Sequence, residues 1–158
     1  MTTTNRSLLK AATSELLVAG NVDAVGSFFT EDYVAHITDQ DMRGGHDLLR
    51  AVVGMYRKAF SGLSAEVVVF LEGDDTVAWR RTMRAKQTGA FKGFPGTGLP
   101  IVWQEMVISR IAGSRIAEEW IVTDLAERLL LGRKSGSPKL SATTKPKLGR
   151  GVNGRAPD

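Results

Sequence analysis

The spacing of hydrophobic residues divides the chain into a helical part followed by a part rich in strands. Residues 7–19 and 46–60 carry apolar side chains three and four positions apart, which is the period of an amphipathic helix. Gly20-Asn21 ends the first helix, and Asp23 can cap a second, short helix that runs to residue 29. Apolar runs predict strands at residues 32–37, 64–72, 76–88, 100–112 and 115–123, before a last short helix at 124–131.

Tight turns join the later strands into antiparallel pairs. Gly73-Asp74-Asp75 and Ala112-Gly113-Ser114 each separate two strand patterns. Because helices come first and antiparallel strands follow, the predicted fold class is α+β. The long strands, such as IVWQEMVI, are apolar at nearly every position, so both of their faces need to be covered. The helices can cover one face and a second subunit the other, which predicts a homodimer.

A glycine-rich segment, GAFKGFPGTGLP at residues 89–100, lies between two of these strands. A phosphate-binding Walker loop needs Gly-Lys-Ser/Thr at the start of a helix, but here Gly93 follows Lys92 and a strand comes next. A dinucleotide fingerprint also needs a helix after its glycines. We therefore predict a long connection between strands, stiffened by Pro95 and Pro100, that lies at the rim of a pocket.

Length and charge indicate one folded domain and a basic tail. The chain has 158 residues and no cysteine, which fits one domain and excludes disulfides, thiolate metal sites and a cysteine nucleophile. The chain has a net charge of +4 because residues 132–158 hold seven Lys or Arg residues and one Asp, which gives +6, while residues 1–131 carry −2. We expect residues 1–131 to form the domain and residues 132–158 a disordered, solubilising tail, for which nucleic-acid binding is the weaker interpretation. The N-terminal residues lack the apolar run of a signal peptide or membrane span, so a cytoplasmic protein with no membrane partner is expected.

The loop and the last hairpin carry motifs that resemble those of a known family. Residues 88–98 read T-G-x-F-x-G-x-P-x-T-G, and residues 110–124 read RIAGSRIAEEWIVTD. Together they are similar to motifs of the SnoaL-like polyketide cyclases, also called ester cyclases. Tyr33-Val34-Ala35-His36 and Arg43-Gly44 resemble the family's first-strand histidine and the pair before its long helix. The resemblance covers roughly residues 7–131.

This resemblance implies the cone-shaped α+β barrel shared with ketosteroid isomerase, scytalone dehydratase and nuclear transport factor two. In that fold the N-terminal helices pack in a strongly curved, mostly antiparallel sheet and leave a deep apolar pocket. The glycine-rich loop then joins two long strands near the pocket and binds no phosphate. The implied activity is that of a cyclase or isomerase that needs no metal or organic cofactor and acts on a small hydrophobic carbonyl compound.

Asp124 is the candidate acid/base. By strand alternation Glu118, Trp120, Val122 and Asp124 share one face, and a carboxyl group beside Trp120 in an apolar cavity would have a raised pKa. Such a group can act as acid or base near neutrality. In the characterised cyclases that the sequence resembles, the aspartate matching this position catalyses an intramolecular aldol ring closure. The alternative is that Asp124 caps the helix at 124–131.

Five further residues are candidates for holding the substrate. His36 could hydrogen-bond a substrate carbonyl or orient Asp124. Arg80 and Thr82 share a strand face, where Arg80 would pair with an anion, although the adjacent Arg81 must then point the other way. Gln104 could polarise a carbonyl, and Trp120 could line the pocket. Two histidines without clear carboxylate partners predict no metal site. Each of these residues also has an ordinary interpretation: a strand-end histidine, contact with solvent or with a second subunit, or core packing.

Departures from the family motifs leave other functions open. Gln87 stands where many relatives have a histidine, and glutamine cannot transfer protons as histidine does. One alternative is a non-catalytic protein of the same fold that binds a small ligand or serves as a dimeric scaffold. Another is a dehydratase or an epoxide hydrolase; the latter type uses an Asp-Arg-Asp set around a water. Arg80 and Asp124 could supply two of its three members.

Overall fold

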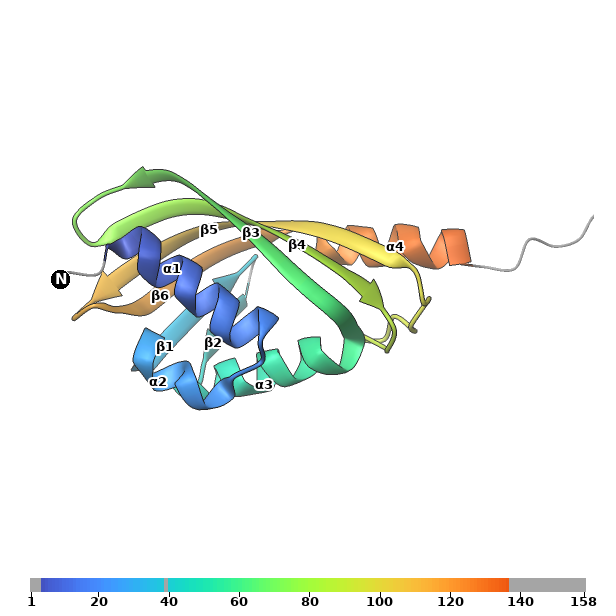
Figure 1. Ribbon diagram of the computed structural model, residues 1–158, viewed down its shortest axis with the longest axis horizontal. Helices are drawn as coiled ribbons and strands as arrows, with labels where there is room; N and C mark the ends of the chain where they lie inside the picture. The colour runs from blue at the N-terminus through green and yellow to red at the C-terminus, as the bar shows by residue number, and fades with distance from the viewer. Residues whose placement is uncertain (1–3, 39, 137–158) are drawn as a thin grey trace, which may run out of the picture.

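The computed structural model describes residues 4–38 and 40–136, and its fold is α+β as predicted (Figure 1). Six strands form one curved sheet that does not close into a barrel. The helices α1, α2 and α3 lie together below one face of this sheet, and α4 extends beyond its end. The helical segments are α1 (Asn5–Ala12), the π-helix η1 (Thr13–Val18), the 3-10 helix η2 (Val22–Ala24), α2 (Val25–Phe28), α3 (Gly45–Ala59) and α4 (Leu125–Gly136).

The sheet order places the first strand beside the last. Its strands lie in the order β2-β1-β6-β5-β4-β3, and all neighbours are antiparallel except β1 and β6. The parallel pair joins the first strand to the last, which a hairpin cannot do. The strands are β1 (Phe29–Ile37), β2 (Gln40–Arg43), β3 (Phe60–Glu72), β4 (Thr76–Gln87), β5 (Pro100–Ala112) and β6 (Arg115–Thr123).

A β-bulge near the start of β6 decides which of its side chains face inward. The turn at Gly113 and Ser114 places Ala112 opposite Arg115 and Ile111 opposite Ile116. The register then shifts by one residue, so that Arg110 lies opposite Glu118. An extra residue in one strand reverses the alternation beyond it. Glu119 is therefore buried on the inner face, while Trp120 is 42% exposed on the other side.

Large apolar residues occupy both faces of the sheet. Trp79 and Trp103 are fully buried on the inner face, against the helices. The opposite side, which we call the outer face, exposes apolar side chains of β3, β5 and β6. Neighbouring pairs such as Met106 and Val122, and Ile108 and Trp120, lie directly across from each other on it. The exposed members are Phe70, Leu71, Val102, Met106, Ile108, Trp120 and Val122.

The glycine-rich loop packs closely against the end of α3. Gly89 donates a backbone hydrogen bond to the Ala59 carbonyl, and a side chain at Gly89 would come within 2.3 Å of the Lys58 carbonyl oxygen. Buried Gln87 holds the loop by donating to the Pro95 carbonyl at 3.1 Å. Phe91 packs on Phe60 with 5.4 Å between ring centroids. The loop is thus a packed connection between β4 and β5, as its position between two strands predicts, but none of its residues is among those that line the pocket, so the predicted place at a pocket rim is not seen.

The structure corrects several local predictions. The short strand β2 and the π-helical turn of η1 were not predicted, and β1 and β3 begin earlier than expected. Asp23 makes no capping hydrogen bond for η2 or α2. Helix α4 continues to Gly136, beyond the predicted helix end at residue 131. The prediction for the remaining tail, residues 137–158, lies outside the described residues. No described helix has the length and apolarity to span a membrane.

Candidate functional site

A cavity of about 100 Å³, counted as the space that water centres can occupy, lies between the inner face of the sheet and the helices. By this measure one water needs roughly 10–15 Å³, so the cavity can hold a small organic molecule. Apolar side chains of α1, η1, α3, β1 and β6 form most of its wall. Its polar lining consists of Thr13, Tyr33, Tyr56, Arg81, Glu105, Glu119 and Thr123.

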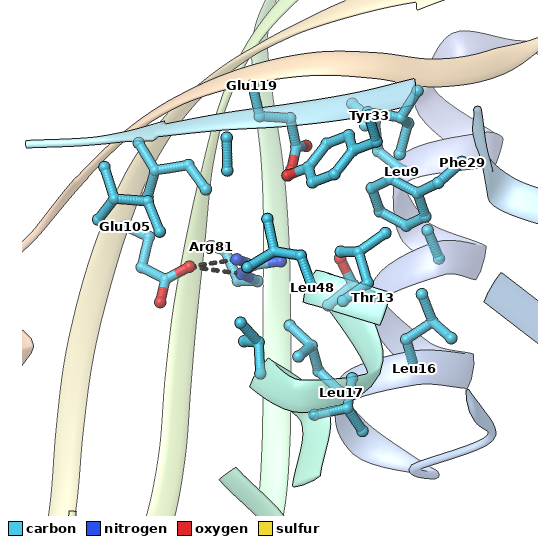
Figure 2. A pocket seen from close by; sticks show the side chains of 18 of the residues that line it. Leu9, Thr13, Leu16, Leu17, Phe29, Tyr33, Leu48, Arg81, Glu105 and Glu119 are labelled. Carbon is cyan, nitrogen blue, oxygen red and sulfur yellow. Dashed lines mark hydrogen bonds and ion pairs between the residues drawn. The ribbon is translucent and has the colours of Figure 1, made fainter. Parts of the chain in front are cut away.

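The residues that line the pocket differ in burial. Leu9, Thr13 and Tyr33 are buried, whereas Met42 and Leu48 are only half-buried. Half-buried side chains thus line the pocket from β2 and from α3. Figure 2 shows this arrangement, with Leu48 in front of the guanidinium of Arg81.

Arg81 and Glu105 form a buried ion pair across β4 and β5, where the two residues lie directly opposite each other. Both Nε and Nη2 of Arg81 donate to Oε2 of Glu105. The other oxygen, Oε1, accepts from Tyr56 Oη at 3.2 Å and from Trp103 Nε1 at 3.1 Å. Burial alone would lower the pKa of Arg81, but the charges of Glu105 and Glu119 raise it. Glu105 thus fixes the Arg81 side chain in its charged form.

Glu119 is the second buried carboxyl group of the pocket. Tyr33 Oη donates to its Oε2 at 2.8 Å, and Ser109 Oγ donates to its Oε1 at 2.7 Å. Ser109 in turn accepts from Trp79 Nε1 at 2.9 Å, which fixes the direction of its own hydrogen bond. Burial raises the pKa of Glu119, and this effect outweighs the opposing influence of the Arg81 charge and of the two hydrogen bonds. A carboxyl group with a raised pKa in a cavity is a candidate acid/base.

The two pocket tyrosines act as hydrogen-bond donors. Burial and the neighbouring carboxyl groups raise the pKa of Tyr33 and of Tyr56 well above the usual value for a phenol. Both therefore stay protonated at neutral pH. Tyr33 orients Glu119, and Tyr56 orients Glu105.

Arg81 has a donor group left over for a ligand. Its Nη1 makes no hydrogen bond to the residues that the structure describes, and the side chain lines the pocket. In Figure 2 the guanidinium lies beside the cavity, between the carboxyl groups of Glu105 and Glu119. Arg81 can therefore donate a charged hydrogen bond to a substrate oxygen. The Glu119 carboxyl group can exchange a proton with a neighbouring C–H or O–H group of the substrate. Within the described part of the chain, no cluster of His, Asp and Glu side chains has the arrangement of a metal site.

A profile of the SnoaL-like polyketide cyclase family matches residues 7–130, which is most of the chain. The chain belongs to this family. The SnoaL-like motifs of the loop and of the last hairpin lie inside the matched range, so the resemblance seen in the sequence is confirmed. No curated protein matches the sequence at a significant level.

Solved structures of SnoaL-like proteins have the same fold at low sequence identity. A candidate polyketide cyclase from Acidithiobacillus ferrooxidans superposes with a TM-score of 0.72 and 21% identity, over 85% of this chain and 99% of that one. A SnoaL-like polyketide cyclase from Agrobacterium tumefaciens gives 0.68 and 20%, over 82% and 99%. AclR, a candidate hydroxylase from Streptomyces galilaeus, gives 0.65 and 24%, over 83% and 98%. At these identities the likeness shows the fold and not the reaction.

The predicted site residues of this SnoaL-like protein lie outside the pocket, on the strands β1, β4, β5 and β6 and at the start of α4. None of the six is among the residues that line the pocket. His36 stacks on Trp120 with ring centroids 5.1 Å apart, and its nitrogens contact Asp41 and Glu118 at 2.5 and 2.7 Å. Three of the other four are the half-buried Arg80, which lies over Phe70, the buried Thr82 and the exposed Gln104.

Asp124 links the start of α4 to β5. Its Oδ1 accepts from the Gln104 backbone N–H at 2.7 Å, and its Oδ2 accepts from Arg128 Nε at 3.0 Å. Both oxygens are thus bound outside the pocket, which agrees with a structural role at the helix start. The prediction of Asp124 as the acid/base remains a prediction that this geometry does not favour.

Sequence reasoning missed Glu119, Glu105 and Arg81 because the inner and outer positions of these strands look alike. The adjacent pairs Arg80-Arg81 and Glu118-Glu119 each offer one residue to either face. One signal was present. Trp79 and Trp103 alternate with Arg81 and Glu105, so placing the tryptophans in the core would also have placed this ion pair there.

Proposed function

We propose that this SnoaL-like protein is a cofactor-independent enzyme that moves a proton on a neutral, hydrophobic carbonyl compound, by aldol-type ring closure or isomerisation. Glu119 is the acid/base. The observation that carries the proposal is a buried carboxyl group with a raised pKa on the wall of a largely apolar cavity. Arg81, with a free Nη1 on the same wall, supports it as the group that holds the substrate oxygen.

The proposed ring closure needs only one carboxyl group. Ionised Glu119 removes a proton from the carbon next to a carbonyl, and the electron pair forms an enolate whose oxygen faces Arg81. That carbon attacks a second carbonyl of the same molecule, and a carbon–carbon bond forms while the C=O π pair moves to oxygen. The new alkoxide takes the proton back from Glu119, so protons and electrons balance without a further reagent.

The neighbours of Glu119 and Arg81 have supporting roles. Tyr33 and Ser109 hold the carboxyl group in place, while Glu105 keeps the guanidinium of Arg81 oriented toward the cavity. Because Glu105 balances the charge of Arg81, the pocket has no net positive charge to attract an acidic substrate. A neutral carbonyl compound fits it better.

Deuterium exchange tests the proposal without knowledge of the natural substrate. The full-length protein is incubated in D2O with β-tetralone, a bicyclic ketone with exchangeable protons next to its carbonyl, and exchange is followed by NMR. We expect exchange above the buffer rate for the wild type and none for Glu119→Gln. Asp124→Asn, with its carboxyl group outside the pocket, is the matched control and should keep the wild-type rate. Loss of exchange in Asp124→Asn alone, or equal rates for all three proteins, would overturn the proposal.

An epoxide hydrolase is the second candidate, because Arg81 lies between two buried carboxyl groups. That reaction needs one carboxylate to activate a water and one acid to protonate the epoxide oxygen. Glu105 is poorly suited as the acid, because Arg81 and Trp103 can only donate to it. Hydrolysis of styrene oxide that Glu119→Gln abolishes, without ketone exchange by the wild type, would favour this candidate.

We also propose that the outer face is the interface of a homodimer. Its apolar side chains form one patch across β5 and β6, and such patches usually mark interfaces. On this side Arg80 Nε is buried without a hydrogen-bond partner in the described residues, so an acceptor from a second copy would satisfy it. Light scattering should give a dimer mass for the wild type and a monomer mass for Met106→Glu. Met55→Glu, an exposed apolar position on α3, is the control and should stay dimeric. A monomeric wild type would overturn this proposal.

A further inference from the structure

Thr13 is a polar residue on the apolar side of the N-terminal helix, and the proposed chemistry does not use it. It is 4% exposed, and it lines the pocket together with Leu9, Leu16 and Leu17. Its hydroxyl makes no hydrogen bond to any residue that the structure describes. Because Thr13 lines the cavity and its hydroxyl has no protein partner there, a ligand that enters the cavity can form a hydrogen bond with it.

The local backbone supports this interpretation. A threonine inside a helix commonly hydrogen-bonds the carbonyl four residues earlier. In this chain the Thr13 backbone N–H donates to the Leu9 carbonyl but the hydroxyl does not, and the π-helix η1 begins at Thr13. Single π-helical turns occur often at functional sites. The hydroxyl is left without an acceptor in its own helix.

Thr13 and Arg81 lie on facing walls of the pocket, one from the N-terminal helix and the other from β4 (Figure 2). Each contributes a group that lacks a protein partner, the hydroxyl of Thr13 and Nη1 of Arg81. The wall beside Thr13 is formed by leucines. A ligand that satisfies both groups therefore has an apolar body and two separated oxygen atoms.

We propose that Thr13 determines specificity by hydrogen-bonding a second oxygen of the substrate, while Arg81 binds the first. The inference rests on the proposed function, in which the first oxygen is the reacting carbonyl. The preferred substrates are then neutral hydrophobic compounds with two oxygen functions, such as hydroxyketones or diketones. A pocket with a dedicated hydrogen-bonding group discriminates strongly against an analogue that lacks the matching oxygen.

Calorimetric titration of the full-length protein with two ketones tests the proposal. The probes are α-tetralone, with one oxygen, and its 4-hydroxy derivative, with two. The wild type should bind the hydroxylated ketone about tenfold more tightly, which corresponds to one hydrogen bond in a buried site. Thr13→Val keeps the shape but removes the hydroxyl, and it should abolish this preference. Thr13→Ser keeps the hydroxyl and should restore it.

The outcomes separate this inference from the proposed function. Equal affinities of the wild type for the two ketones, or no binding of either, would overturn the role of Thr13. So would a preference that survives in Thr13→Val. A preference lost only in Thr13→Val, in a protein that shows no deuterium exchange, would support the binding site and reject the acid/base chemistry. Thermal unfolding of both variants checks that they fold as the wild type does.

Discussion

Arg81 and Glu105 lie opposite each other on neighbouring strands, and two donors of the guanidinium reach one oxygen of the carboxylate. This pair lies in the wall of the cavity and not on the surface. A buried pair of this kind adds little net stability, because removing two charges from water is costly. Its value to the protein is the fixed position that it gives to Arg81.

Breaking the pair should cost far more than removing it. Arg81→Met leaves the Glu105 charge buried without its partner, and we expect a loss of about 3–5 kcal/mol in the free energy of unfolding. The double variant Arg81→Met/Glu105→Gln removes both charges and should recover most of that loss. Urea denaturation of the wild type, both single variants and the double variant measures the coupling. Additive effects of the two substitutions would contradict the role of the pair.

The raised pKa of Glu119 predicts how stability depends on pH. Burial favours the protonated form, so the folded protein binds more protons than the unfolded chain between the usual glutamate pKa and the raised value. Stability should therefore fall as pH rises through this window. Glu119→Gln cannot ionise, so this part of the decline should disappear in urea titrations at a series of pH values. An unchanged decline would show that another group causes it.

The same pKa predicts the pH dependence of the proposed reaction. Glu119 must be ionised to act as a base, so the exchange rate should rise with pH through its raised pKa, above the range of an exposed glutamate. The measurement is the exchange of β-tetralone protons as a function of pH. A rise at the pH of an ordinary glutamate would contradict the burial that the structure shows.

His36 connects β2, β1 and β6 on the outer side through Asp41 and Glu118. The hydrogen bonds to Asp41 and then to Glu118 raise the pKa of His36, and the bond to His36 lowers that of each carboxyl group. Arg110 also contacts Glu118, and Arg43 contributes to the lowered pKa of Asp41. The charged arrangement is thus complete between the lowered pKa values of the carboxyl groups and the raised pKa of His36.

The stability that His36 contributes should be fully present below the pKa of an unfolded histidine and lost as pH rises through the raised value. The difference in unfolding free energy between the wild type and His36→Gln should therefore shrink as pH rises from below the usual histidine pKa through the raised pKa of His36. A constant difference would mean that the ring acts only by stacking on Trp120. Met42 of β2 lines the pocket, so the binding of the hydroxylated tetralone can be measured over the same pH range.

Close packing makes Gly89 far more sensitive than its loop position implies. Gly89→Ala places a methyl group against the Lys58 carbonyl, so we expect a loss of about 2 kcal/mol or more in the free energy of unfolding. Gly54, inside α3, has nothing within 4 Å of a new methyl group. Gly54→Ala is the control and should stabilise the protein by roughly 0.5–1 kcal/mol. Thermal or urea unfolding distinguishes the two, and a neutral Gly89→Ala would contradict the described packing.

The fold was predictable from the sequence because its signals are local and agree with one another. Strands β5 and β6 have the predicted bounds, since the turn between them fixes where each strand ends. Strand β2, with the sequence QDMR, has no apolar pattern to reveal it. Helix α3 shows the predicted stripe, and Leu48, Leu49 and Val52 from it line the pocket.

The inward position of Glu119 was not predictable because a single bulge reverses the faces of β6. Without the register shift after Ile116, Glu118 and Trp120 would face the helices and Glu119 would face outward. The extra residue is Ala117, which is buried beside Ile116. Nothing in residues 115–119 marks the bulge. Counting alternate positions from the turn therefore places Glu118 on the inner face and Glu119 on the outer face, which is the reverse of the structure.

The parallel pairing of β1 with β6 also sets when the pocket can form during synthesis. Tyr33 and Glu119 are separated by 86 positions in the chain, yet they share a hydrogen bond in the finished site. Strand β1 leaves the ribosome long before its neighbour β6 exists, and such distant pairings form late. A nascent chain that ends before β6 holds α1 to α3 and four other strands but has no partner for this edge of β1. The candidate catalytic carboxyl group thus comes from the last strand to be translated among the described residues, and no chain that lacks this strand has a complete pocket.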